Sequence, residues 1–250
     1  MPDPHIAIPP LAINARNVTL RLGRGTAEVE ILKGIDLDVA AGTTVALLGA
    51  SGSGKSSLMA VLSGLERASG GDIHVAGADF GALGEDELAL ARRGKIGIVL
   101  QAFHLLPTMT ALENVAVPLE LSGAPDAFDR ATRELEAVGL GHRLHHYPSQ
   151  LSGGEQQRAA IARATVSQPA ILFADEPTGN LDGTTGEAIL DLLFARQRDT
   201  GATLLMITHD RALAARCDRV IEMRDGRIIA DHRPDDSPDL PAIAPAERHA

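Results

Sequence analysis

The octapeptide GASGSGKS at residues 49–56 constrains the fold of this chain most, because it fits the pattern G-x-x-x-x-G-K-[ST]. It lies between an apolar run, residues 43–48, and a helix-like stretch, residues 57–65. In a P-loop of this kind, glycines let main-chain N–H groups surround a phosphate chain, and the lysine reaches its outer phosphates. A Gly/Ser-rich turn is the alternative interpretation, but the strand–loop–helix context favours phosphate binding. The expected nucleotide-binding residues are Gly49, Ser51, Gly52, Ser53, Gly54, Lys55, Ser56 and Ser57.

The composition allows a large globular domain and argues against nucleic acid as a partner. With 250 residues, 44% of them hydrophobic, the chain can bury a sizeable core. Its formal net charge of −10 is opposite in sign to that of a typical nucleic-acid binder, and an anionic membrane surface would repel it. The sequence contains neither a signal-peptide pattern nor an uncharged apolar stretch of about 18 residues. We therefore expect another chain to cross the membrane if this protein serves one.

Apolar runs without alternation are separated by helical stretches, which favours a parallel sheet covered on both faces. Residues 11–40 instead read as antiparallel strands joined by a turn at 23–25. The remaining expected strands are 43–48, 73–75, 96–100, 170–174 and 203–208, and the expected helices are 57–65, 85–93, 111–121, 126–138, 152–166 and 184–199. We predict an α/β P-loop NTPase fold with a mostly parallel core sheet, an N-terminal antiparallel β piece and an inserted helical subdomain.

The domain boundaries follow from the same pattern. The domain spans 11–230, with the helical subdomain at about 102–168 and an N-terminal extension at 1–10. The pattern decays after Ile228, and the proline-rich stretch 234–250, with little to bury, is predicted to be a mobile tail.

Polar side chains follow three further apolar runs at the point where each run ends: Gln101 after 96–100, Asp175 and Glu176 after 170–174, and His209 after 203–208. Ligands of open α/β sheets gather outside the carboxyl ends of the strands. We therefore expect these four side chains to converge with the P-loop on one phosphate site.

Each of these groups can take part in nucleotide chemistry. Asp175 can reach Mg²⁺, often through a water molecule, while the Ser56 hydroxyl coordinates it directly. Glu176 can polarise the water that attacks the γ-phosphate, and Gln101 can contact both the metal and that water. His209 can donate a hydrogen bond to the γ-phosphate. A solvated turn is the alternative for the two adjacent carboxylates, and the upstream P-loop favours the site.

The segment LSGGEQQR at residues 151–158, called the signature segment below, starts a helix with an S-x-x-E capping box. A capped helix start is the simplest interpretation. However, two glycines beside a free helix N-terminus also expose N–H groups and a serine hydroxyl, which together make a second anion site. One nucleotide does not need two such sites.

Taken together, these motifs resemble, in order and spacing, those of the nucleotide-binding subunit of an ABC transporter: the P-loop at 49–56, Gln101, LSGGEQQR at 151–158, ILFADEP at 171–177, GNLD at 179–182 and His209. The resemblance covers residues 11–230 and implies an ABC ATPase with ATP and Mg²⁺ as cofactors, Mg²⁺ being held by Ser56, Gln101 and Asp175. It also implies that two copies pack head to tail. Ser152, Gly153, Gly154 and Glu155 of one copy then contact the ATP held by Lys55 of the other, with Asp182 at the dimer interface.

The resemblance further implies specific roles for the convergent residues. Glu176 is expected to be the general base and His209 the γ-phosphate switch. The groove near Gln101 and the helical insertion is expected to be the docking surface for a membrane permease.

Within that family, the chain resembles the LolD, MacB and YbbA branch on PTGNLD at 177–182, LLP at 105–107 and ALENV at 111–115. ARCDR at 215–219 and LFADEPTGNLD at 172–182 lean toward the YbbA type. This implies lipoprotein, lipid or other hydrophobic cargo, and a location on the cytoplasmic face of the inner membrane through the permease. A lipase or esterase, or a periplasmic component, is a further implied partner.

One position departs from the family pattern. The family usually stacks adenine on an aromatic side chain, and Leu22 occupies that position in a chain with only 2% aromatic residues. Leucine can cover the base by apolar contact but loses ring stacking, which is worth about 1–3 kcal/mol for aromatic–base pairs.

Two alternatives belong to other functional classes. A soluble ABC ATPase that acts on DNA or ribosomes rather than in transport would require a long coiled coil or tandem cassettes, and the sequence contains neither. A subunit that binds ATP without hydrolysing it is disfavoured because both Glu176 and His209 are present.

Overall fold

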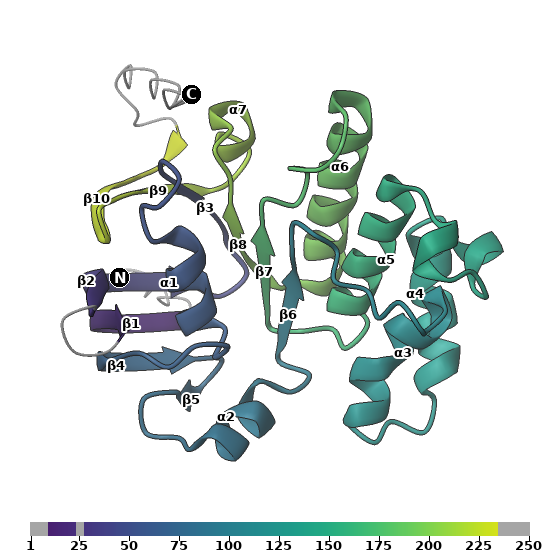
Figure 1. Cartoon of the computed structure of the whole chain (residues 1–250), viewed down its shortest axis with the longest axis horizontal. Helices are drawn as coiled ribbons and strands as arrows, with labels where there is room; N and C mark the ends of the chain where they lie inside the picture. Colours follow the sequence, from purple (N-terminus) through teal and green to yellow (C-terminus); the bar gives the residue numbers. More distant parts are fainter. Residues whose placement is uncertain (1–9, 24–27, 235–250) are drawn as a thin grey trace, which may run out of the picture.

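The computed structural model describes residues 10–23 and 28–234 of the chain, and its strands form two sheets (Figure 1). The smaller sheet is antiparallel with the order β2-β1-β4-β5, and the larger one has the order β10-β9-β3-β8-β7-β6. Strands β9, β3, β8, β7 and β6 of the larger sheet are parallel. The strands are β1 (Leu11–Leu22), β2 (Val29–Ala40), β3 (Thr44–Leu48), β4 (Gly70–Val75), β5 (Ala78–Asp79), β6 (Ile96–Val99), β7 (Ile171–Asp175), β8 (Thr203–Ile207), β9 (Arg219–Arg224) and β10 (Arg227–His232). The predicted fold class, with its mostly parallel sheet and separate antiparallel piece, is confirmed.

Helices follow most of the strands of the larger sheet. They are α1 (Lys55–Leu62), α2 (Glu85–Arg92), α3 (Ala111–Leu121), α4 (Ala127–Ala137), α5 (Gly153–Thr165), α6 (Gly183–Thr200) and α7 (Arg211–Ala214), together with short 3-10 helices at Gly141–Arg143 and Pro148–Gln150. Helix α3 has its predicted bounds, whereas α1 ends at Leu62 rather than Leu65. Gly64 follows with a φ of +70°, a left-handed conformation that terminates helices.

Strand β3 explains why its apolar run does not alternate with polar residues. Val45 and Leu47 point into a core shared with the antiparallel sheet and α1. Ala46 and Leu48 point into a second core, shared with α6, on the other face of the same sheet. Because both faces are covered, every residue of β3 is buried, and burial of apolar surface on both sides stabilises the central strand.

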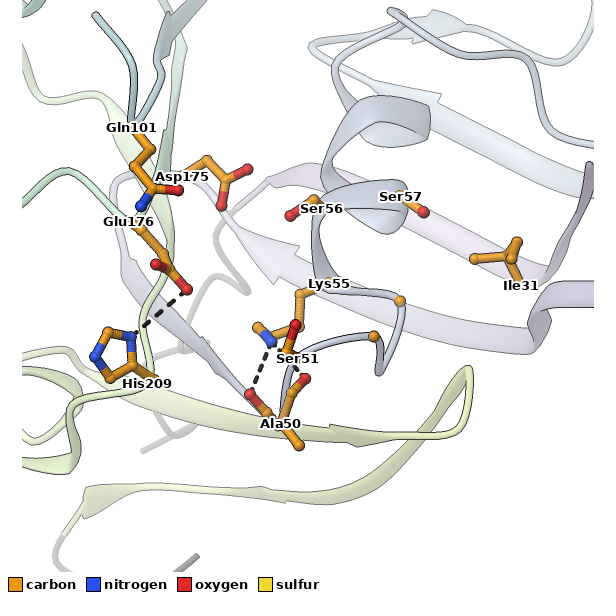
Figure 2. Close-up of a pocket in the computed structure, with 13 residues that line it drawn as sticks. Ile31, Ala50, Ser51, Lys55, Ser56, Ser57, Gln101, Asp175, Glu176 and His209 are labelled. Atoms are coloured by element: carbon orange, nitrogen blue, oxygen red, sulfur yellow. Dashed lines mark hydrogen bonds and ion pairs between the residues drawn. The ribbon is translucent and has the colours of Figure 1, made fainter. Parts of the chain in front are cut away.

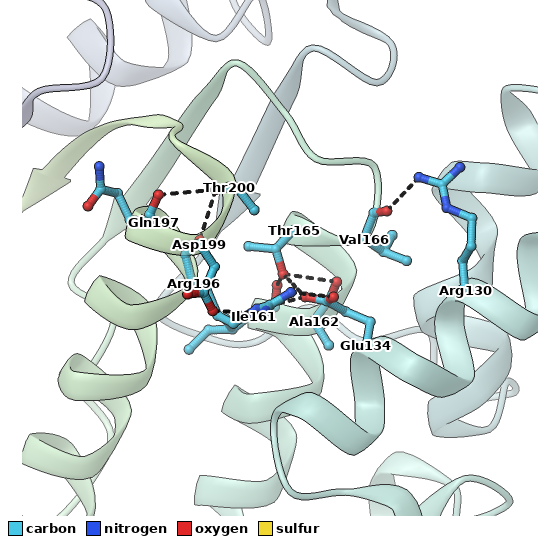
Figure 3. Close-up of polar contacts among 10 residues, drawn as sticks. All are labelled: Arg130, Glu134, Ile161, Ala162, Thr165, Val166, Arg196, Gln197, Asp199 and Thr200. Carbon is cyan, nitrogen blue, oxygen red and sulfur yellow. Dashed lines mark hydrogen bonds and ion pairs between the residues drawn. The ribbon is translucent and has the colours of Figure 1, made fainter.

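Helices α3, α4 and α5 enclose a third apolar core, which includes Val115, Leu135 and Ala162. In Figure 1 they lie at one end of the molecule, beyond β6. A largely buried ion pair joins this group to α6, where Arg196 Nε lies 3.1 Å from Glu134 Oε1 and Thr165 Oγ1 donates to the same carboxylate (Figure 3). The group formed by α3, α4 and α5 therefore contacts α6, which packs on the larger sheet, through polar as well as apolar groups.

The β9–β10 hairpin was missed by the sequence analysis, which expects regular structure to decay after Ile228. Strand β10 lies at the edge of the sheet, and its residues alternate between exposed and half-buried. Such a strand needs no apolar run, because its hydrogen bonds to β9 hold it in place.

Parts of three predictions fall outside the described residues: the N-terminal extension at 1–10, the turn at 23–25 and the tail at 234–250. Among the residues that the structure describes, no helix has the length and apolar character needed to cross a membrane.

Candidate functional site

The loop between β3 and α1 has the backbone conformation that its glycines predict. Gly49 and Gly54 have φ values of +156° and +99°, in the region that side chains with a Cβ rarely adopt. A Cβ on Gly49 would lie 2.4 Å from the main-chain oxygen of Met223 in β9. Gly54 caps α1 without any side-chain hydrogen bond. The first N–H groups of α1 are therefore not capped by a side chain.

Lys55 folds back over this loop. Its Nζ donates to the main-chain oxygens of Gly49, at 2.7 Å, and Ala50, at 2.9 Å, and the residue is only 7% exposed (Figure 2). Nearby, the buried hydroxyl of Ser53 has no hydrogen-bond partner among the described residues. A buried ammonium that bonds only carbonyl oxygens, beside an unpaired hydroxyl, matches a loop built to receive an anion.

The strand-end residues face this loop across one cavity of about 750 Å³, within the usual range for small-molecule sites. In Figure 2, Gln101, Asp175, Glu176 and His209 lie on one side and the P-loop serines on the other. The cavity is lined by Ile31, Gly49, Ala50, Ser51, Gly52, Gly54, Lys55, Ser56, Ser57, Gln101, Asp175, Glu176 and His209. All four strand-end residues named from the sequence therefore line the same cavity as the P-loop.

Burial and charge perturb two groups at the floor of the cavity in opposite directions. Burial lowers the pKa of Lys55, while Glu176 and Asp175 act to raise it. Burial raises the pKa of Asp175, an effect that a hydrogen bond from Ser56 partly offsets. Because burial disfavours both charged forms, a ligand of opposite charge would stabilise each of them: an anion for the lysine and a cation for the aspartate.

The site offers a set of oxygen donors suited to Mg²⁺. The Ser56 hydroxyl, the Asp175 carboxylate and the Gln101 amide all line the cavity, and hard oxygen ligands of this kind are those that Mg²⁺ prefers. The raised pKa of Asp175 indicates a carboxylate that a bound cation would stabilise. These residues therefore fit the ion.

Glu176 and His209 form a pair at the mouth of the cavity. His209 Nδ1 lies 3.5 Å from Glu176 Oε1, and the histidine side chain is 73% exposed whereas the glutamate is 28% exposed. Glu176 has a φ of +42°, a strained conformation for a residue with a side chain, and its N–H donates to the oxygen of Ile207. The carboxylate is thus held at the strand end, facing the cavity, while the imidazole reaches solvent.

Three residues near the P-loop differ from the sequence analysis or add to it. Ser53, expected to be a binding residue, is buried and is not part of the cavity lining, so its contact with the nucleotide stays a prediction. Leu22 is also absent from the lining and is 43% exposed, and its contact with the base stays a prediction. Ile31 lines the cavity instead, beyond Ser57 in Figure 2, and was not foreseen. No local signal marks Ile31, because it reads simply as one residue of β2.

The signature segment lies elsewhere, at the start of α5. Ser152 and Glu155 cap each other, with Ser152 N to Glu155 Oε2 at 2.8 Å and Glu155 N to Ser152 Oγ at 3.3 Å, as the capping-box pattern predicts. The hydrogen bond from the Ser152 main chain is the main cause that lowers the pKa of Glu155 to about 2, and Arg143 contributes. Ser152, Gly153, Gly154 and Glu155 do not line the cavity.

Asp182 is also separate from the cavity. It is exposed at the start of α6, where its carboxylate accepts hydrogen bonds from the N–H and hydroxyl of Thr185. These bonds lower the pKa of Asp182. Within one chain, therefore, Asp182 acts as a helix cap.

Comparisons with known proteins identify the family of this chain. Residues 32–179 match the ABC transporter family. Among curated relatives, the chain is 48% identical to the ABC transporter ATP-binding protein YbbA of Escherichia coli K12, covering 86% of this chain and 96% of that protein. It is 47% identical to the lipoprotein-releasing system ATP-binding protein LolD of Geobacter metallireducens, covering 88% of this chain and 98% of the relative. It is also 47% identical to the macrolide export ATP-binding/permease protein MacB of Nitrosomonas europaea, of which it spans 35%.

Among solved structures, the fold is similar to a dimeric, post-hydrolysis state of the ATP-binding cassette MJ0796 bound to ADP and Pi. The TM-score is 0.82 at 36% sequence identity, and the match covers 89% of this chain and 98% of that one. The sequence relatives and the structural neighbour point to one group of proteins. The chain belongs to the ABC transporter family and is an ATP-binding subunit of the LolD, MacB and YbbA type.

Proposed function

We propose that this chain hydrolyses ATP with Mg²⁺ in the cavity between the P-loop and the strand ends, and that hydrolysis drives a membrane permease. The observation that carries the proposal is the convergence of Lys55, Asp175, Glu176 and His209 on one cavity. The family membership supports ATP as the nucleotide, since a structural neighbour is bound to ADP and Pi.

The proposed chemistry assigns a task to each group. Lys55 exchanges its two carbonyl partners for the outer phosphates of ATP and orients them. Glu176 accepts a proton from the attacking water, and its backbone conformation holds the carboxylate toward the cavity. His209 donates a hydrogen bond to the γ-phosphate. Ser56, Asp175 and Gln101 would hold Mg²⁺, which neutralises charge on the phosphates when bound.

The proposed active form is a head-to-tail dimer of this chain. Ser152 and its glycines lie outside the cavity within one chain, so a second copy would have to bring them to the nucleotide. The dimeric state of the structural neighbour supports this arrangement. Asp182 would then lie across the interface.

The coupled partner is proposed to be an integral-membrane permease that holds the chain at the cytoplasmic face of the inner membrane. Support comes from MacB, whose name joins ATP-binding and permease functions, and from LolD, named for a lipoprotein-releasing system. Lipoprotein, lipid or another hydrophobic compound is the proposed cargo. Hydrolysis measured with the chain alone and with its co-purified permease in lipid nanodiscs tests the coupling. A rate that does not respond to the permease counts against it.

The ATPase proposal is tested by Glu176→Gln in the purified chain. Because the amide cannot accept the proton, phosphate release should fall by about 100-fold or more, while ATP binding persists. With ATP and Mg²⁺ the variant should also elute as a dimer. The matched control is Glu120→Gln, which alters an exposed glutamate away from the cavity. Hydrolysis by Glu176→Gln at the wild-type rate would show that Glu176 is not the general base.

A further inference from the structure

The segment of residues 101–104, called the Q segment, lies between β6 and α3 and has an unusual backbone. Phe103 and His104 have φ values of +60° and +47°, so two consecutive residues with side chains adopt the left-handed conformation. Histidine is among the residues found more often in this region, but a bulky residue such as Phe103 rarely adopts it. Such a conformation persists only where its surroundings impose it.

The main-chain oxygens of both residues accept hydrogen bonds from α5. Arg163 donates from Nη1 to the main-chain oxygen of His104 at 2.7 Å and from Nη2 to that of Phe103 at 2.9 Å. The guanidinium thus binds both strained residues at once, in the two-pronged geometry that arginine offers and lysine does not.

The hydrogen bonds of the Arg163 side chain go to the Q segment. Burial lowers its pKa, and among residues 10–23 and 28–234 no carboxylate lies within ion-pair distance of it. Arg163 is half-buried, and a partly buried guanidinium with no acid beside it is costly unless its N–H groups are satisfied. Here its two carbonyl contacts are to the Q segment.

The other side of the Q segment is also held by side chains. Asn180, which follows β7, donates from Nδ2 to the main-chain oxygen of Gln101 at 2.9 Å. A Cβ on Gly179 would lie 2.7 Å from the side-chain nitrogen of Gln101, so that side chain has no room on this flank. The direction of Gln101 into the cavity therefore depends on contacts made by neighbouring elements.

We propose that Arg163 is a positioning residue that holds the Q segment so that Gln101 faces the nucleotide, and that it ties Gln101 to the helix carrying the signature segment. Arg163 lies 11 residues after Ser152, about 16 Å along the axis of α5. Phe103 reaches the other end of the same helix, because its ring lies 3.9 Å from the Cβ position of Gly153. Under this proposal, a movement of the signature end would be transmitted to the Q segment through both contacts. This inference rests on the proposed ATPase function.

The test uses the full-length chain with Arg163→Lys and Arg163→Ala, because Arg163→Lys keeps the charge and loses the two-pronged contact. In hydrogen–deuterium exchange without nucleotide, exchange in the peptide covering 101–106 should rise by about tenfold in both variants. The matched control is Arg130→Lys, since Arg130 also donates to a main-chain oxygen next to α5, that of Val166, but does not touch the Q segment (Figure 3). Exchange that stays at the wild-type level in Arg163→Lys would overturn the proposal.

Kinetics separate positioning from simple destabilisation. For Arg163→Lys, kcat should fall about tenfold while KM for ATP changes less than about twofold, because Gln101 acts on the metal and the attacking water. In a Gln101→Ala background the same substitution should have almost no further effect, since the group it positions is gone. Multiplicative losses in the double variant would overturn the proposal. If the wild-type chain itself fails to hydrolyse ATP, the proposed function is wrong, and the exchange measurement still tests the contact.

Discussion

The P-loop and the signature segment both contain glycines at the start of a helix, but only the signature segment caps its helix with side chains. Helix α1 has Gly54 at its N-cap and no side-chain cap, and Lys55 bonds only carbonyl oxygens. Helix α5 is capped by its own side chains, through the reciprocal bonds of Ser152 and Glu155. The N–H groups at the start of α1 are therefore open to a ligand, whereas some of those at the start of α5 already donate to side chains of the same helix.

Their surroundings differ in the same sense. The P-loop lines a cavity whose far wall supplies carboxylate, amide and imidazole groups. Ser152 is exposed, and the signature segment is outside that cavity. The comparison teaches that only the first helix start faces that cavity within a single chain. Under the proposed function, the second would add contacts to a nucleotide that is held by another copy.

The largest effect that would break this comparison is expected for Lys55→Met. The variant keeps the apolar stem but loses the ammonium that neutralises phosphate charge, so ATP affinity of the dilute chain should fall by about 100-fold, within the range for a buried charge contact. Isothermal titration calorimetry measures it. Unchanged affinity would mean that the P-loop is not the primary phosphate site.

A smaller effect is expected for Gly154→Ala at the signature segment. The new Cβ would lie 2.8 Å from Cγ2 of Thr185, so either the Thr185 side chain or the start of α5 must shift. Hydrolysis should fall by about tenfold, while ATP affinity of the dilute chain stays unchanged. Gly84→Ala is the matched control, because the nearest heavy atom to its Cβ position is a flexible glutamate oxygen at 3.6 Å. A loss of ATP affinity in Gly154→Ala would show that the two helix starts are not independent within one chain.

The pH dependence of the stability of Glu155→Gln tests whether side chains cap α5. The pKa of Glu155 is lowered from 4.5 to about 2, so its ionised form stabilises the fold above pH 4.5, and this contribution is lost as the pH falls toward 2. The free energy of unfolding of Glu155→Gln should therefore lie below that of the wild type at neutral pH, and the gap should narrow below pH 4.5. Urea titrations followed by circular dichroism at several pH values measure it. If the difference in the free energy of unfolding between the two proteins does not change with pH, the ionised Glu155 does not stabilise the fold by capping α5.

The smallest effect is expected for Leu22→Tyr, which restores the aromatic ring typical of the family. If Leu22 covers the base, ATP affinity should rise by a few-fold, less than the full stacking contribution of about 1–3 kcal/mol, because the ring must also be ordered. The gain should be larger for ATP than for GTP. Equal changes for both nucleotides, measured by competition binding, would remove Leu22 from the base contact.

Much of the site could be predicted from the sequence because its signals are local. The spacing of Gly49, Gly54 and Lys55 dictates a loop that only glycine can form at its tightest points. The polar residues after β6, β7 and β8 had to meet at one edge, since parallel strands end on the same side of a sheet. The capping box of Ser152 and Glu155 was predictable for the same reason, as both partners lie within one helical turn.

Other features could not be read locally because their partners are distant in the sequence. Ile31 enters the cavity because β2 passes the start of α1, where its main-chain oxygen lies 3.3 Å from the Cβ position of Gly54. Arg163 meets His104 across 59 residues, and Arg196 meets Glu134 across 62. No periodicity or motif marks such pairs, because their residues come into contact only when two helices, or a helix and a loop, pack together.

The sequence by itself determined that this chain carries a P-loop and polar residues at the ends of its parallel strands, because those motifs act through neighbouring residues and through the common direction of parallel strands. Only the tertiary structure decided that Lys55 rests on carbonyl oxygens, that the signature segment stands apart from the cavity, and that Arg163 holds the Q segment in a strained conformation. The physical reason is that buried charges, and residues in the left-handed backbone conformation, are stabilised by groups from distant parts of the chain. Only folding brings those groups into contact.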